Sequence, residues 1–203
     1  MLANSTPFKR ISAQLILMLR RYPGVAFLLP LWIVLQYCGG LPWWEYSRPE
    51  LQAGQLWRLW SAHFVHLNDT HLAMNALGLL AIVSVWGSAL RGWRTLVLSL
   101  WIAPMISLAL WLTEPQLAFY AGASGVLHGL FAAGIILARD IHPSWRGLAA
   151  VLLAVKLIGE TQFNTGSAAL IGAPVIHAAH QWGALFGALA ASAYRWTMQN
   201  RRR

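Results

Sequence analysis

The sequence predicts an all-α protein, a polytopic bundle of six helices that cross a membrane. Of its 203 residues, 58% are hydrophobic and only 10% are charged, unlike an average soluble domain. Six apolar stretches lie at residues 23–39, 70–88, 95–112, 124–138, 147–163 and 174–194. Several of them are near the lower length limit for spanning a bilayer. We expect one domain at residues 23–196, with a basic segment at 1–22 and a basic tail at 197–203.

The basic residues predict how the chain is oriented. The formal net charge is +9, and in a six-span chain every lysine and arginine except Arg48, Arg58 and Lys156 falls on one side. Positively charged loops stay in the cytoplasm, so both termini, with segments 1–22 and 197–203, are expected there. The positive charge therefore indicates topology in a lipid bilayer, and we expect no nucleic-acid partner.

The first span ends at a strong helix breaker, Gly39-Gly40-Leu41-Pro42. The loop that follows, residues 41–68, carries Trp43, Trp44, Trp57 and Trp60 together with charged residues. Indole rings prefer the membrane interface, so we expect the loop to lie at the outer surface as an anchor. A role in gating access from that surface is the alternative.

The second span begins at Asn68-Asp69-Thr70, which are favourable capping residues. His71 and Asn75 follow, four residues apart, and therefore share one face of the helix. Polar groups inside a membrane are costly and mark functional sites by default, although a histidine can also cap or bridge helices. The third span then runs from the cytoplasmic side to the outer side, where it ends near Thr113.

Ser124 opens the fourth span between two glycines, Gly122 and Gly125. Glycines allow another backbone to approach closely, and a helix start leaves N–H groups that stabilise an anion. A nucleophile with an oxyanion site has this pattern. Small residues also mark ordinary helix–helix packing in membranes, and that interpretation stays open at this point.

The fifth span contains Lys156 and Glu160, whose spacing predicts an ion pair with a structural role. The sixth span carries His177 and His180, followed by two glycines on the His180 face, Gly183 and Gly187. That glycine face can pack closely against the glycine face of the fourth span.

Four polar residues from three spans are expected at one depth. Spans two, four and six all enter from the outside, and each of these residues lies within about two turns of that entry, at roughly 1.5 Å per residue. Packing alone does not require this coincidence, whereas serine chemistry needs a base beside the hydroxyl and donors for an oxyanion. The four residues are His71, Asn75, Ser124 and His180.

These patterns resemble a known family. Gly122-Ala123-Ser124-Gly125, Ala179-His180-x-x-Gly183-x-x-x-Gly187, His66-x4-His71-x3-Asn75 and Trp57-Arg58 are similar to the signatures of rhomboid intramembrane serine proteases. The compact chain and the Gly-Val-Leu-His-Gly that follows Ser124 look most like the rhombosortase branch. That resemblance implies a bacterial inner membrane and a membrane-anchored protein substrate with a Gly-Gly-containing C-terminal signal.

The resemblance also implies roles for individual residues. Ser124 would be the nucleophile and His180 the general base, a dyad without a carboxylate, since no acidic residue in the sixth span can orient His180. The Ser124 N–H, His71 and Asn75 would form the oxyanion hole. Residues expected to have structural roles near the site are Gly122, Gly125, His66, His128, Gly183 and Gly187.

Other chemistries stay open as alternatives. His177 is a rival base, although it lacks the glycine register that follows His180. No cofactor or metal is expected: a site of His63, His66 and His177 is conceivable, but no His-Glu-x-x-His motif is present. A rhomboid protease with other substrates, a non-catalytic rhomboid relative and a small proton-carrying transporter are the other functions considered.

Overall fold

The computed structural model describes residues 16–163 and 168–201. Most of the expected N-terminal basic segment, residues 1–15, lies outside this described part, as do residues 202–203 of the expected basic tail. Residues 16–21 are helical and lead into the first long helix.

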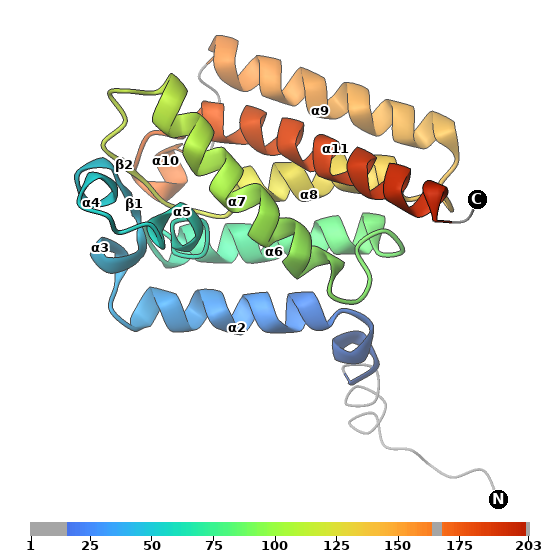
Figure 1. Cartoon of the computed structure of the whole chain (residues 1–203), viewed down its shortest axis with the longest axis horizontal. Helices are drawn as coiled ribbons and strands as arrows, with labels where there is room; N and C mark the ends of the chain where they lie inside the picture. The colour runs from blue at the N-terminus through green and yellow to red at the C-terminus, as the bar shows by residue number, and fades with distance from the viewer. Residues whose placement is uncertain (1–15, 164–167, 202–203) are drawn as a thin grey trace, which may run out of the picture.

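Six long helices run side by side through the described part of the chain (Figure 1). Each coincides with one of the apolar stretches expected from the sequence, which confirms that the protein is mostly helical. They are α2 (Pro23–Tyr37), α6 (Asp69–Trp86), α7 (Arg94–Thr113), α8 (Ser124–Leu137), α9 (Pro143–Phe163) and α11 (His177–Asn200).

The loops at one end of the bundle contain the remaining elements. A two-stranded antiparallel sheet, which the sequence did not predict, pairs β1 (Tyr46–Ser47) with β2 (Phe119–Tyr120). Tyr46 lies opposite Tyr120 in this pair. The short helices are α3 (Leu41–Trp44), α4 (Arg48–Gln52), α5 (Arg58–Ser61) and α10 (Ala168–Ile171).

The six predicted membrane crossings receive partial support. Among the described residues, α6 and α7 are long and apolar enough to cross a bilayer, and α2 and α8 are apolar but shorter. Outward faces of the bundle expose apolar side chains such as Leu77, Val97 and Val155, which suits a lipid environment. The count of six crossings stays a prediction.

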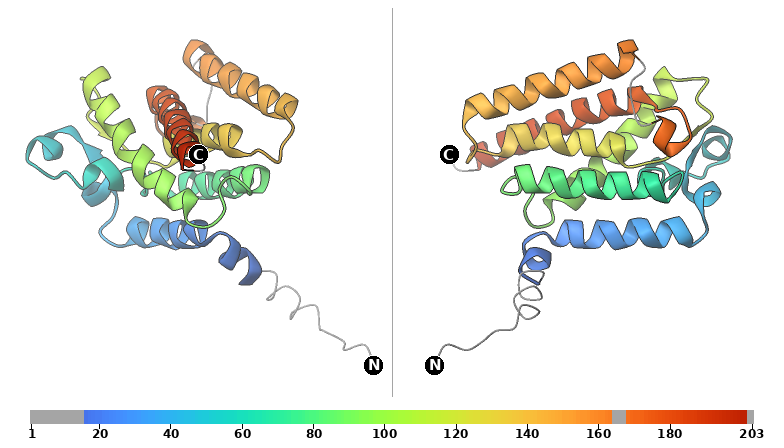
Figure 2. Two further views of the ribbon diagram at one scale, coloured as in Figure 1. Left: turned by 45° about the vertical axis from the view of Figure 1, so that its right-hand side comes forward. Right: turned by 180° about the vertical axis from the view of Figure 1, so that it is seen from behind.

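Helix α8 occupies the middle of the bundle and contacts α6, α7, α9 and α11. Seen from behind, α9 and α2 form opposite edges, with α11, α8 and α6 between them (Figure 2). Helix α8, which carries the expected nucleophile, therefore lies in the interior, and α11, which carries the expected base, packs against it.

Glycines bring the backbones of α8 and α11 into direct contact. A methyl group added to Gly183 would lie 1.9 Å from the carbonyl oxygen of Gly125, and one added to Gly187 would lie 2.0 Å from that of Gly129. Both distances are far below van der Waals contact. No larger residue fits at these two positions unless the helices move apart.

The outer loop is folded against the bundle by two arginines. The buried guanidinium of Arg58 donates hydrogen bonds to the carbonyl groups of Pro42 and Glu45. Arg48 donates to carbonyl groups at the end of α7, including those of Trp111 and Glu114. These bonds satisfy backbone carbonyl groups that would otherwise lack partners at the ends of α3 and α7.

We expect Gly187→Ala to destabilise the protein because its new methyl group would overlap the backbone of α8. Overpacking of this kind costs about 1–3 kcal/mol, and thermal unfolding in detergent measures it as a lower Tm. Gly147→Ala is the matched control, since a methyl group on Gly147 of α9 meets no atom within 4 Å. An unchanged Tm for Gly187→Ala would contradict the close contact.

Candidate active site

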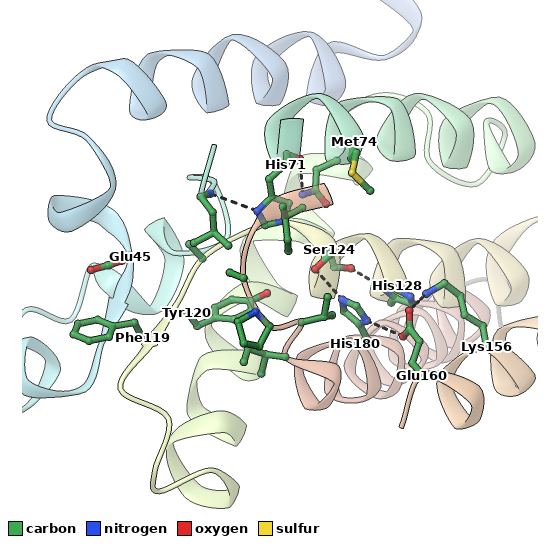
Figure 3. Close-up of a pocket in the computed structure, with 18 residues that line it drawn as sticks. Glu45, His71, Met74, Phe119, Tyr120, Ser124, His128, Lys156, Glu160 and His180 are labelled. Atoms are coloured by element: carbon green, nitrogen blue, oxygen red, sulfur yellow. Dashed lines mark hydrogen bonds and ion pairs between the residues drawn. The ribbon is translucent and has the colours of Figure 1, made fainter. Parts of the chain in front are cut away.

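Ser124 and His180 meet where α8 and α11 begin. The Nε2 atom of His180 lies 2.9 Å from the hydroxyl oxygen of Ser124, and the His180 side chain is buried (Figure 3). Ser124 is the first residue of α8, and His180 lies in the first turn of α11. An imidazole nitrogen at this distance can accept the hydroxyl proton as a general base.

His71 lies against the segment that leads into Ser124. Gly122 has a φ angle of +123°, and a methyl group there would lie 2.5 Å from Cε1 of His71, so both conformation and space require glycine. The backbone N–H of Leu67 points at Nδ1 of His71, at 3.4 Å. This contact favours the tautomer with the proton on Nε2, which leaves Nε2–H as a donor.

Asn75 lies one helical turn beyond His71 and lines the same cavity. Its buried Nδ2 donates to the carbonyl oxygen of His71 at 3.0 Å, which uses one of two amide hydrogens. Ala123, the residue before α8, makes no side-chain cap, and N–H groups in a first helical turn have no intrahelical acceptor. Side-chain and backbone donors are therefore both available beside Ser124.

Glu160 is a neighbour of His180 that the expectation of a dyad without a carboxylate did not include. Its Oε2 lies 2.9 Å from Nδ1 of His180, and its Oε1 pairs with the ammonium group of Lys156 (Figure 3). The expectation rested on acidic residues of the sixth span, whereas Glu160 comes from α9, which packs beside α11. The sequence places Glu160 at the outer end of the fifth span, at the depth of Ser124. This position could have identified it as a neighbour of His180.

His128 and His177 have different relations to His180. Nδ1 of His128 lies 2.7 Å from the carbonyl oxygen of Ser124, and its ring stacks on that of His180 with centroids 4.2 Å apart. The His177 ring lies 6.2 Å from that of His180, and its Nδ1 is 4.0 Å from Oε2 of Glu160. The histidine beside the Ser124 hydroxyl is thus His180, whereas His128 contacts the Ser124 backbone.

His66 and His63 form a buried layer behind His71. The ring of His66 packs edge-on against His71 at 5.2 Å, and Nε2 of His63 lies 2.9 Å from the hydroxyl of Ser107. Gln36 holds the backbone of His66 by two hydrogen bonds. Burial lowers the pKa of both histidines to about 3, so both are neutral at physiological pH.

One group of three residues in the described part of the chain has the geometry to hold a metal ion. The ligand atoms of His128, Glu160 and His180 all lie within 4.8 Å of one another. This is a different set from the conceivable site of His63, His66 and His177. Both ring nitrogens of His180 already contact Ser124 or Glu160, so an ion there would displace one of these contacts.

A cavity of about 560 Å³ opens over these residues. Its polar side contains Ser124, His180, His71 and Asn75, and its other walls are formed by apolar side chains of Met74, Phe119, Ile171, Pro174, Val175 and Ile176. It lies at the end of the bundle with β1, β2 and α10, away from the end of α11 (Figures 1 and 3). An extended peptide with apolar side chains would suit these walls.

The comparisons with known proteins point to one family. A model of the Rhomboid domain matches residues 53–197, which include every polar residue of the cavity's reactive side. A search of curated proteins returned no match.

We expect stability to fall as the pH drops below about 6.5, the ordinary pKa of histidine. His63 and His66 have folded pKa values near 3, so between these pH values the unfolded chain binds protons that the folded chain does not. Each such group removes up to about 1.4 kcal/mol per pH unit in this window. Tm in detergent, measured at about pH 7.5 and about pH 5, reports the loss.

His66→Phe tests this effect because neither ring nitrogen of His66 has a hydrogen-bond partner among the described residues. The Tm of this variant should fall less on acidification than that of the wild type. His142→Phe, at an exposed position, is the control, and its Tm should fall as much as that of the wild type. Equal acid sensitivity of the wild type and His66→Phe would contradict the assigned burial effect.

Proposed function

This chain belongs to the rhomboid family of intramembrane serine proteases, and we propose that it hydrolyses a peptide bond in or next to a transmembrane segment of its substrate. Ser124 is the nucleophile and His180 the general base. The observation that carries this proposal is the 2.9 Å contact between Ser124 Oγ of α8 and His180 Nε2 of α11, which both line the cavity.

The reaction proceeds through an acyl-enzyme. Ser124 Oγ bonds to the carbonyl carbon of the scissile peptide while its proton passes to Nε2 of His180. The C–N bond then breaks, and the leaving amine takes the proton from His180. Water next loses a proton to His180, attacks the ester and releases Ser124 Oγ, which regains that proton.

Three donors surround the place where the carbonyl oxygen becomes negative. They are the Ser124 N–H at the start of α8, Nε2–H of His71 and the second amide hydrogen of Asn75. All three residues line the cavity. Fixed donors stabilise the oxyanion more strongly than water does, because they need no reorganisation.

The substrate is a membrane-anchored protein, in our proposal one with a Gly-Gly-containing C-terminal signal of the rhombosortase type. A helix hides its carbonyl groups in hydrogen bonds, and glycines are poor helix formers, so a Gly-Gly segment unwinds at low cost. The resemblance of the Ser124 motif to rhombosortases supports this choice. Equal cleavage of a reporter with Leu-Leu in place of Gly-Gly would favour a rhomboid with other substrates.

The protein functions, we infer, in a bacterial inner membrane with both termini in the cytoplasm and the cavity open toward the outer side. The charge distribution supports this orientation. Arg91 and Arg139 lie in turns, and Arg94 and Arg146 lie in the first turns of α7 and α9. All four are at the end of the bundle where α11 also ends, opposite the cavity (Figure 1).

We expect Ser124→Ala and His180→Ala to lose proteolysis of a membrane-anchored reporter, by at least about 10⁴-fold. Covalent labelling by a fluorophosphonate probe in detergent should disappear in Ser124→Ala, because the probe captures an activated serine. Ser84→Ala is the matched control, since that hydroxyl bonds to the carbonyl of Leu80 in its own helix.

The alternatives predict other outcomes of the same measurements. A non-catalytic relative or a transporter would show no labelling and no cleavage in the wild type. If His177→Ala abolished labelling while His180→Ala retained it, the assignment of the base would be wrong.

We expect His71→Ala and Asn75→Ala each to lower kcat by about 10²- to 10³-fold, as loss of one oxyanion donor does. KM should change little, because these bonds form mainly in the transition state. Steady-state kinetics on the reporter separates the two constants. An increase in KM at constant kcat would instead indicate that the residues bind the ground-state substrate.

A further inference from the structure

We propose that Glu160 positions His180, so that the reacting groups form a Ser124–His180–Glu160 triad whose carboxylate is held by Lys156. This inference rests on the proposed function. It assigns a role to an acidic residue on α9 that is reached only when three helices, α8, α9 and α11, pack together (Figure 3).

The first argument is the tautomer of His180. Its Nδ1 faces Oε2 of Glu160 at 2.9 Å and its Nε2 faces Oγ of Ser124 at 2.9 Å. A carboxylate only accepts hydrogen bonds, so the ring proton is on Nδ1 and the lone pair of Nε2 points at the serine. This is the tautomer that a general base requires, and the contact with Glu160 selects it.

The second argument concerns charge. When His180 takes the serine proton, it becomes a cation in a buried site, which is costly without a counter-charge. The other titratable groups around it are His71 on α6, His128 on α8, His177 on α11 and Lys156 on α9, and none of these supplies negative charge. Glu160 is the acidic group, among the described residues, that contacts His180.

The third argument is how Glu160 itself is held. Its side chain is 11% exposed, and that of Lys156 is 50% exposed. A surface ion pair four residues apart on a helix would need only one carboxylate oxygen. Here Oε1 pairs with Lys156, while Oε2 is directed into the bundle at the imidazole. Lys156 therefore fixes the carboxylate rotamer.

Stacked rings hold His180 in the required plane. The His128 and His180 rings are 17° from parallel, and Nδ1 of His128 is tied to the backbone of Ser124. The imidazole is thus restrained on its face by His128 and at its two nitrogens by Glu160 and Ser124. A carboxylate partner would be effective in this setting, because the ring has little freedom to turn away from it.

The test compares Glu160→Gln, Glu160→Asp and Lys156→Met with the wild type. Glu160→Gln keeps the size of the side chain but removes its charge, and we expect kcat to fall by about 10²- to 10⁴-fold with little change in KM, as when the orienting acid of a serine protease triad is replaced by its amide. Glu160→Asp should recover part of the loss, and Lys156→Met should lose less than Glu160→Gln. Glu114→Gln, at the end of α7 outside the cavity, is the control.

Two readouts distinguish positioning from a structural role. In Glu160→Gln the acidic limb of the rate–pH profile should move to lower pH, because protonated His180 has lost its counter-charge. The ring N–H proton of His180, identified by NMR through its loss in His180→Ala, should be strongly downfield in the wild type and move upfield in Glu160→Gln. Retained Tm in Glu160→Gln shows that the bundle still folds.

The outcomes separate this inference from the proposed function. Wild-type protein that neither cleaves the reporter nor reacts with the fluorophosphonate would refute the protease assignment. Active wild-type protein with a Glu160→Gln variant of similar kcat, within about threefold, and an unchanged pH profile would overturn the triad alone. A fall in kcat that tracks a fall in Tm equally in Glu160→Gln and Lys156→Met, at constant pH profile, would also overturn it.

Discussion

The contact between the backbones of α8 and α11 is the constraint on which the site depends. Ser124 and His180 each lie at the start of their helix, just before a pair of glycines that meets the other pair. The separation of the two helices is therefore set by main-chain atoms, which cannot change rotamer. A hydroxyl and an imidazole on these helices reach hydrogen-bonding distance because nothing larger than hydrogen separates the backbones beneath them.

A second layer of buried polar groups holds the nucleophile from the loop side. The N–H of Gly122 donates to the carbonyl of Ala62, and the Tyr120 hydroxyl donates to the carbonyl of Gly122. His71 fills the space that a side chain on Gly122 would occupy. Burial raises the pKa of Tyr120 and lowers those of His63 and His66, so this layer stays uncharged and keeps one pattern of donors and acceptors.

Much of this arrangement was predictable from the sequence because helical periodicity relates neighbours within one element. The facing of His71 and Asn75, the pairing of Lys156 with Glu160 and the glycine face after His180 all follow from spacings of three or four residues. The contact of Glu160 with His180 did not follow, since it depends on the rotation of α9 against α11. The sheet of β1 and β2 was missed because two-residue strands lack a periodic pattern.

The pairing of β1 with β2 links the outer loop to the segment that leads into Ser124. Tyr46 pairs with Tyr120 and Ser47 pairs with Phe119. Tyr120 is only a few positions before Ser124. The same strand pair thus holds the outer loop and the segment that precedes the nucleophile. An insertion between Tyr120 and Ser124 would shift the serine itself, so the strand pairing fixes the length of this connection.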